Sequence, residues 1–253
     1  MRLLHVVAVG IAAAILAGCS GSLDADTTEG QSITILAAAS LRSTFTEVGR
    51  LFEAQHPGTR VVFNFAGSSD LSTQLDQGAP GDVFASADTA NMTKATGAGL
   101  TASEPVNFAT NVLTIVVPPG NPANIVSFED LTRPEVKAVV CAPQVPCGTA
   151  TRRIEDATGI HLSPVSEESS VTDVLGKVVT GQADAGLVYV TDAAAARDKV
   201  ATVPFPEAAR VVNTYPIAVL RRSGNVDTAE SFVAFVLGPE GRRVLSDAGF
   251  GTP

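Results

Sequence analysis

Tryptophan is absent from the 253-residue sequence, and aromatic and metal-binding side chains are scarce. Aromatic residues make up 5% of the chain, which weakens a sugar-binding role because sugar sites depend on aromatic platforms. The chain has three histidines, of which His5 lies in the apolar N-terminal run, and they lack the spacing of metal ligands. A metal bound by protein side chains is therefore not expected.

Positive charge is also in short supply. The sequence holds 17 Lys and Arg against 26 Asp and Glu, which gives a net charge of -9 at pH 7, and the cationic residues form no cluster. Proteins that bind nucleic acids or anionic lipid surfaces present a basic patch to them, so we expect no nucleic-acid partner. The acidic balance also disfavours an anion-binding protein, unless the anion is held without Lys or Arg.

The first residues read as a secretory signal. A charged start precedes an apolar run over residues 3–16, which is shorter than a membrane-spanning helix. The ending LAGC at 16–19 resembles the bacterial lipobox, which implies that residues 1–18 are removed and that Cys19 carries lipid. Residues 19–31 are small and polar, as in a tether. The sequence therefore predicts an extracytoplasmic protein that is anchored to the cell membrane through Cys19.

The rest of the chain has the pattern of an α/β protein. Short β-branched runs alternate with amphipathic helical patterns, which is typical of βαβ units and a mostly parallel sheet. Leu41, Phe45, Val48 and Phe52 repeat at helical spacing, and that helix should end near Pro57. We expect strands at 32–39, 60–65, 82–87, 113–117, 138–142, 185–190 and 215–220, and further helices at 69–77, 230–237 and 239–247.

Four junctions between a predicted strand and a predicted helix share small or hydroxyl residues. The free N–H groups and partial positive charge of a helix N-terminus can bind an anion without Lys or Arg. A single serine at such a junction is more often an ordinary helix cap. Four junctions would form an anion site only if the fold brings them together. Their sequences are AASL at 38–41, AGSS at 66–69, PCGT at 146–149 and ESSV at 168–171.

Several motifs together resemble the periplasmic molybdate-binding protein family. They are ITILAAASL at 33–41, FAGSSDL at 65–71, GAPGDVFASA at 78–87 and GLVYVTD at 186–192, and the C-terminal segment 232–250 fits as well. The resemblance covers nearly all of the chain after the tether. It implies a type II periplasmic-binding-protein fold, in which two α/β lobes enclose a ligand cleft. One lobe would hold residues 32–109 plus 216–253, and the other residues 110–215.

The resemblance also implies a set of ligand-binding residues. The oxyanion would be held by the hydroxyl groups of Ser40, Ser68 and Tyr189 and by the backbone N–H groups of Cys147 and Val171. Tyr215, the only other tyrosine, precedes a proline and is expected to serve packing or hinge geometry. A ferric-ion site on this fold would need clustered tyrosines, which the sequence does not offer.

The sequence departs from the family pattern at three places. Cys147 stands where a small, alanine-like residue is usual, which a backbone donor tolerates. Gly67 stands where serine is common, which leaves Ser69 open as the alternative to Ser68. Asp70 brings a carboxylate close to the expected anion, and we interpret it as a favourable acid in the first turn of a helix.

These observations predict a monomeric solute-binding lipoprotein that captures molybdate or tungstate and delivers it to the membrane permease of an ABC importer. Neutral donors fixed at helix starts can replace the water of a buried dianion, so the acidic surface does not exclude an anion ligand. No enzymatic activity and no cofactor are expected. The first alternative is a protein of the same fold that binds another small anion, such as sulfate.

A cysteine-dependent enzyme is the second alternative. Cys147 lies at a predicted helix start, where the pKa of a thiol is lowered. A base is missing, however, because His56 and His161 are expected at the surface. The sequence also contains no nucleophile elbow, P-loop or dinucleotide fingerprint.

A disulfide bond is expected between Cys141 and Cys147. If lipid occupies Cys19, these two cysteines remain, and an even number in an oxidising compartment favours pairing. Residues 142–146 between them form a turn that can bring their Cα atoms into disulfide range. The bond would fix the turn that presents the Cys147 N–H group to the anion.

Overall fold

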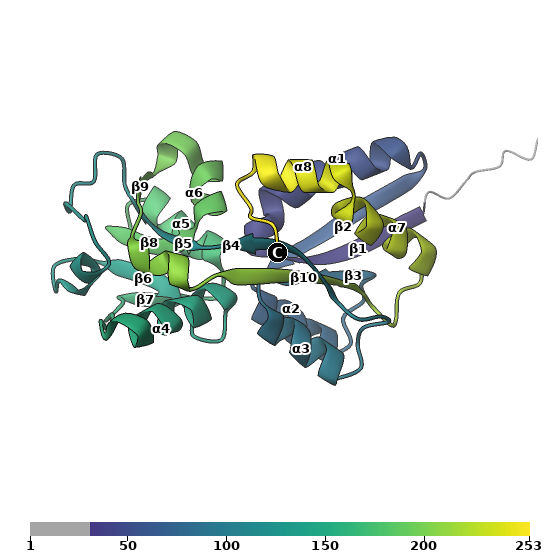
Figure 1. Ribbon diagram of the computed structural model, residues 1–253, viewed down its shortest axis with the longest axis horizontal. Helices are drawn as coiled ribbons and strands as arrows, with labels where there is room; N and C mark the ends of the chain where they lie inside the picture. The colour runs from purple at the N-terminus through teal and green to yellow at the C-terminus, as the bar shows by residue number, and fades with distance from the viewer. Residues whose placement is uncertain (1–30) are drawn as a thin grey trace, which may run out of the picture.

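Two five-stranded sheets organise residues 31–253, the part of the chain that the computed structural model describes. The sheets lie side by side as the centres of two α/β lobes (Figure 1). This is the two-lobed α/β architecture that the sequence predicts. The expected signal peptide, the lipidation of Cys19 and nearly all of the tether lie outside the described residues.

The first sheet has the strand order β2-β1-β3-β10-β4. Strands β1, β2 and β3 run parallel, and β10 is antiparallel to both of its neighbours. Figure 1 shows α1 and α8 on one side of this sheet and α2 and α3 on the other. The strands are β1 (Gln31–Ala38), β2 (Thr59–Ala66), β3 (Val83–Ala85), β4 (Val106–Asn111) and β10 (Asn213–Val219). The helices are α1 (Arg42–Gln55), α2 (Ser68–Asp76), α3 (Thr89–Gly97), α7 (Val226–Leu237) and α8 (Pro239–Asp247).

The core of the first lobe follows the helical spacing seen in the sequence. Leu41, Phe45, Val48 and Phe52 are all fully buried. The Phe45 ring packs against Phe232 of α7 with 6.2 Å between ring centroids. Burial of this one stripe fixes α1 against the sheet and thereby holds the turn between β1 and α1 in place.

The second sheet has the strand order β7-β6-β8-β5-β9. Strand β6 is parallel to β7 and β8, and β5 is antiparallel to β8 and β9. Figure 1 shows α4 on the opposite side of this lobe from α5 and α6. The strands are β5 (Leu113–Val117), β6 (Ala138–Cys141), β7 (Ser166–Glu168), β8 (Ala185–Tyr189) and β9 (Ala201–Val203). The helices are α4 (Pro146–Thr158), α5 (Val171–Val179) and α6 (Val190–Ala196).

Both sheets are mixed, so the prediction of mostly parallel strands was wrong. The antiparallel strands β5 and β10 are the strands that follow each passage of the chain from one sheet to the other. Alternation of strands and helices does not reveal such passages.

Two short segments connect the lobes. Strand β4 ends at Asn111 and β5 begins at Leu113, while the return segment enters β10 at Asn213. Asn111 and Asn213 face each other in the β4–β10 register. Strand β4 of the first sheet thus ends, and β10 begins, a few residues inside 110–215, the range expected for the second lobe.

Strand β1 begins at Gln31, one residue before the strand that the sequence predicts. Gln31 pairs with Thr59 of β2, and its side chain accepts a hydrogen bond from Thr228 at 2.7 Å. Both partners are distant in the sequence, so local composition gives no sign of them.

Candidate functional site

A small cavity of about 190 Å³, part of it open to solvent, lies between the two lobes. All five residues predicted from the family motifs line it, together with residues from each of the four strand-to-helix junctions. Its walls are formed by Ala38, Ala39, Ser40, Gly67, Ser68, Ala87, Val145, Pro146, Cys147, Val171 and Tyr189. None of these side chains carries a charge, so any ligand would be held by neutral groups.

The first lobe contributes two hydroxyl groups. Ser40 lies in a 3-10 turn (Ala39–Leu41) between β1 and α1, and Ser68 is the first residue of α2. The Ser68 oxygen accepts a hydrogen bond from the Ala87 N–H group at 2.9 Å. The single hydrogen of the Ser68 hydroxyl is therefore left for another acceptor.

The second lobe contributes two helix starts. Val171 is the first residue of α5, and Cys147 is the second residue of α4. N–H groups in the first turn of a helix have no acceptor within that helix, and they carry the positive end of its dipole. Both residues line the cavity, so these donors belong to an anion-compatible wall.

Tyr189 ends β8 and is almost fully buried, with 1% of its surface exposed. Its hydroxyl oxygen accepts a hydrogen bond from Asn213 Nδ2 at 2.9 Å. Burial raises the pKa of this hydroxyl well above its ordinary value of 10.0. Tyr189 therefore stays protonated and keeps a hydrogen to donate.

The carboxylate of Asp192 caps the start of α6 close to Tyr189. It accepts a hydrogen bond from the Tyr189 N–H group at 3.2 Å. Burial raises the pKa of Asp192 from 3.8 to about 7, and the Tyr189 N–H group opposes this increase. Asp192 is thus a buried acid near the cavity, and its pKa of about 7 means that its charge changes near neutral pH.

Three polar residues behind the cavity escaped prediction from the sequence. Tyr215, which we assigned to packing or hinge geometry, has its hydroxyl 3.0 Å from the Ser40 hydroxyl. Asn213 bonds to Tyr189, and Asn111 donates to the Thr191 hydroxyl at 2.8 Å. The two asparagines are recognisable only from their positions where the chain passes between the lobes.

The two serines at the start of α2 differ in position. Ser68 lines the cavity, whereas Ser69 does not. The Ser69 hydroxyl is buried and has no hydrogen-bond partner within residues 31–253. Asp70 follows in the first turn of α2, where the helix dipole favours a carboxylate.

A disulfide joins Cys141 to Cys147, which confirms the predicted pairing. Their Cα atoms are 5.6 Å apart, and the bond closes the turn before α4. A cysteine-dependent enzyme, our second alternative, would need a free thiol that this bond removes. His161 is exposed, and the His56 ring stacks on the Phe52 ring with 4.0 Å between centroids. Neither histidine lines the cavity that Cys147 lines.

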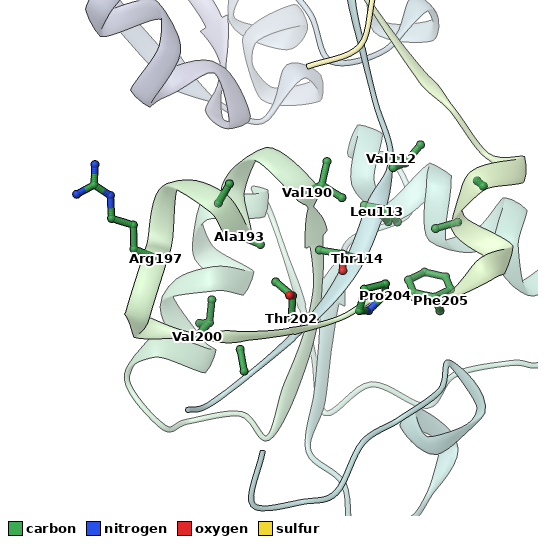
Figure 2. A pocket seen from close by; sticks show the side chains of 14 residues that line it. Val112, Leu113, Thr114, Val190, Ala193, Arg197, Val200, Thr202, Pro204 and Phe205 are labelled. Atoms are coloured by element: carbon green, nitrogen blue, oxygen red, sulfur yellow. The ribbon is translucent and has the colours of Figure 1, made fainter. Parts of the chain in front are cut away.

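A larger groove of about 1290 Å³, part of it open to solvent, lies on the second lobe beside α6, β5 and β9. Figure 2 shows mainly apolar side chains around it. Arg197 is the one charged residue on its wall, and its side chain points away from the groove (Figure 2). The groove therefore lacks the converging donors that the small cavity has.

Residues 31–253 contain no group of three His, Cys, Asp or Glu side chains that could hold a metal ion. Within the same range, every helix is too short or too polar to cross a membrane.

Comparisons with known proteins place the chain among transport proteins. The family model of bacterial extracellular solute-binding proteins matches residues 33–251. The molybdate-binding protein ModA of Mycobacterium tuberculosis (strain ATCC 25618 / H37Rv) is 62% identical over 223 residues, which cover 88% of this chain and 85% of that protein.

Solved structures share the fold. The periplasmic molybdate-binding protein of Azotobacter vinelandii superposes with a TM-score of 0.73 at 22% identity, covering 87% of this chain and 99% of that one. The sulfate-binding protein SubI of Mycobacterium tuberculosis H37Rv gives a TM-score of 0.70 at 24% identity, covering 87% and 86%. Because proteins named for different anions share the fold, the residues of the cavity must decide the ligand.

Proposed function

The chain belongs to the bacterial extracellular solute-binding protein family, and we propose that it captures molybdate or tungstate and delivers it to an ABC importer. The 62% identity to a protein named for molybdate binding supports this ligand. The observation that carries the proposal is the uncharged cavity between the lobes, where hydroxyl groups and helix starts converge.

We assign the ligand contacts to the hydroxyl groups of Ser40, Ser68 and Tyr189 and to the N–H groups of Cys147 and Val171. A tetrahedral dianion presents only acceptor oxygens, and these five groups are all able to donate. Loss of water from a buried dianion is costly unless donors replace the water, and hydrogen bonds to a charged acceptor are the stronger kind. The cavity therefore needs no Lys or Arg.

Selectivity would follow from the type and spacing of the donors. Monoprotonated phosphate brings a hydrogen that needs an acceptor, and a cavity lined by donors supplies none. Sulfate is a smaller dianion, so donors fixed by two lobes would lose hydrogen-bond geometry around it. Molybdate and tungstate are nearly alike in size and charge, and both should bind.

The location and partners complete the proposal. Lipid on Cys19 would hold the protein at the outer side of the cell membrane, and the tether 19–31 would let the lobes reach the permease. The two lobes would be residues 32–109 plus 216–253 and residues 110–215, with the protein acting as a monomer. The lipid anchor can be tested by mass spectrometry of the purified protein, which should show lipid on Cys19 and loss of residues 1–18.

A thermal-shift panel on the protein without residues 1–19 tests the ligand. A ligand that binds only the native state raises Tm, and the increase grows with the logarithm of the ratio of ligand concentration to Kd. Molybdate and tungstate should raise Tm, whereas matched sulfate and phosphate should have little effect. Equal shifts with sulfate would favour the alternative of a general small-anion binder.

A further inference from the structure

The side-chain amide of Asn213 joins the two lobes directly behind the cavity. Asn213 is the first residue of β10 and is 6% exposed. Its Nδ2 atom lies 3.0 Å from the Ala87 carbonyl oxygen of the first lobe and 2.9 Å from the Tyr189 hydroxyl of the second. The amide nitrogen therefore has a partner in each lobe.

The orientation of this amide is fixed by chemistry. A carbonyl oxygen can only accept a hydrogen bond, so the atom that faces Ala87 must be the nitrogen of Asn213 and not its oxygen. The second hydrogen of that nitrogen is then directed to the Tyr189 oxygen. Asn213 Oδ1 is left without a hydrogen-bond partner within residues 31–253, although it is buried. A buried polar atom without a partner is costly, which singles this residue out.

The bond from Asn213 decides what the Tyr189 hydroxyl can do. Its oxygen accepts from Asn213, so its one hydrogen must go elsewhere. The Tyr215 hydroxyl is one acceptor for it, and this contact lowers the pKa of Tyr215 against the larger increase caused by burial. The other destination is the cavity, which Tyr189 lines. A charged acceptor in the cavity forms the stronger hydrogen bond and takes the hydrogen.

Ala87 extends the connection to a second hydroxyl. Its carbonyl oxygen accepts from Asn213, and its N–H group donates to the Ser68 oxygen. The hydroxyls of Tyr189 and Ser68 come from opposite lobes, and each has its oxygen occupied by a donor behind the cavity. Each is thereby left with one hydrogen for a ligand.

We infer that Asn213 is a positioning residue for the anion, which holds the Tyr189 hydroxyl as an acceptor so that its hydrogen is donated to the ligand. The inference rests on the proposed function and deepens it. Through Tyr189, Asn213 would make the cavity specific for fully deprotonated anions, although Asn213 itself does not line the cavity.

A double-mutant cycle separates this role from a structural one. Molybdate affinity is measured by calorimetry for the wild type, Asn213→Ala, Tyr189→Phe and the double variant, with ligand-free Tm as the measure of folding. Asn213→Ala should weaken binding about tenfold, the loss of roughly one hydrogen bond. In the Tyr189→Phe background the same change should weaken binding less than about twofold, because the hydroxyl through which Asn213 acts is gone.

Asn111→Ala is the matched control. Asn111 faces Asn213 across the β4–β10 register, and its side chain bonds to Thr191 of the second lobe. Asn111 does not bond directly to the Tyr189 hydroxyl, so removal of that hydroxyl should change the effect of Asn111→Ala on affinity less than it changes the effect of Asn213→Ala. If Asn213→Ala fails to fold, Asn213→Ser replaces it, because the serine side chain is too short to reach Tyr189.

The outcomes distinguish the inference from the proposed function. An Asn213 effect of equal size in both backgrounds, or no effect while Tyr189→Phe weakens binding, would overturn the positioning role and leave the molybdate site intact. A wild-type protein that does not bind molybdate would overturn the proposed function itself.

Discussion

Gly67 of the first lobe lies so close to Ser169 of the second that a β-carbon at position 67 would stand 2.2 Å from the Ser169 carbonyl oxygen. Gly67 precedes the cavity residue Ser68, and Ser169 lies two residues before the cavity residue Val171. The two lobes therefore meet at backbone contact directly beside the candidate site.

Gly67→Ala should weaken anion binding by keeping the lobes apart. The φ of Gly67 is -58°, which alanine adopts freely, so the ligand-free protein should keep its Tm within a few degrees. We expect molybdate affinity to fall by about tenfold or more, equivalent to roughly 1.4 kcal/mol. Calorimetry on the variant gives both quantities.

Gly97→Ala is the control for Gly67→Ala. A β-carbon at Gly97 would meet no atom within 4 Å, and its φ is not in the left-handed region. The control should bind like the wild type. Unchanged affinity in Gly67→Ala as well would show that the approach to Ser169 is not needed for binding.

Removal of a serine hydroxyl should weaken molybdate binding only where that serine lines the cavity. Ser40→Ala and Ser68→Ala should each weaken molybdate binding by about 1.5–3 kcal/mol, the contribution of a hydrogen bond to a charged group. Ser69→Ala should have little effect because Ser69 does not line the cavity. A loss in Ser69→Ala with none in Ser68→Ala would reverse our choice between the two serines.

Reduction of the Cys141–Cys147 disulfide should act on the site more than on the fold. The loop between these cysteines is short, so the chain-entropy model gives about 2 kcal/mol of stabilisation. The larger consequence is local, because the turn places the Cys147 N–H group at the cavity and an ordered turn lowers the cost of binding. Measurement of molybdate affinity and of ligand-free Tm, each with and without reductant, shows whether reduction affects binding more than folding. A large fall in Tm with unchanged affinity would contradict it.

Asp192 should make the protein less stable as pH rises towards 8. Its pKa is raised by burial from 3.8 to about 7 in the folded state, so the folded protein binds the proton more tightly than the unfolded chain. The stability that it contributes is fully present below pH 3.8 and is lost as pH rises through about 7. Between pH 5 and pH 8 this loss is at most about 3 kcal/mol.

Asp192→Asn tests this pH dependence. Asparagine keeps an oxygen that can accept from the Tyr189 N–H group but carries no charge. Denaturant unfolding should show that the stability difference between variant and wild type increases from pH 5 to pH 8 in favour of the variant. A difference that does not change with pH would mean that Asp192 does not titrate in this range.

Local patterns in the sequence predicted much of the fold. The stripe from Leu41 to Phe52 predicted α1, and the bounds of β5 and α8 agree with the expected ranges. Such features depend on neighbours within a few residues, where helical spacing, β-branched runs and Pro or Gly signals act. The pairing of Cys141 with Cys147 was also predictable, because both cysteines flank one short turn.

Features that depend on distant pairing were not predictable. Asn213 gains its role from Tyr189 and Ala87, and the Tyr215 hydroxyl gains its role from Ser40, which lies 175 positions earlier in the sequence. The antiparallel pairings of β5 with β8 and of β10 with β3 likewise join strands that are far apart in the sequence. A sequence pattern records which residues share a face, but not which face of another element they meet.

The central claim is that molybdate binds in the cavity between the lobes. Anomalous diffraction tests it most directly, with crystals grown in molybdate and data collected at an energy where molybdenum scatters anomalously. We expect one strong anomalous peak per chain in the cavity between the lobes, within hydrogen-bonding reach of the hydroxyls of Ser40, Ser68 and Tyr189 through the molybdate oxygens. A peak only in the groove beside α6, or no peak at a saturating molybdate concentration, would contradict the account.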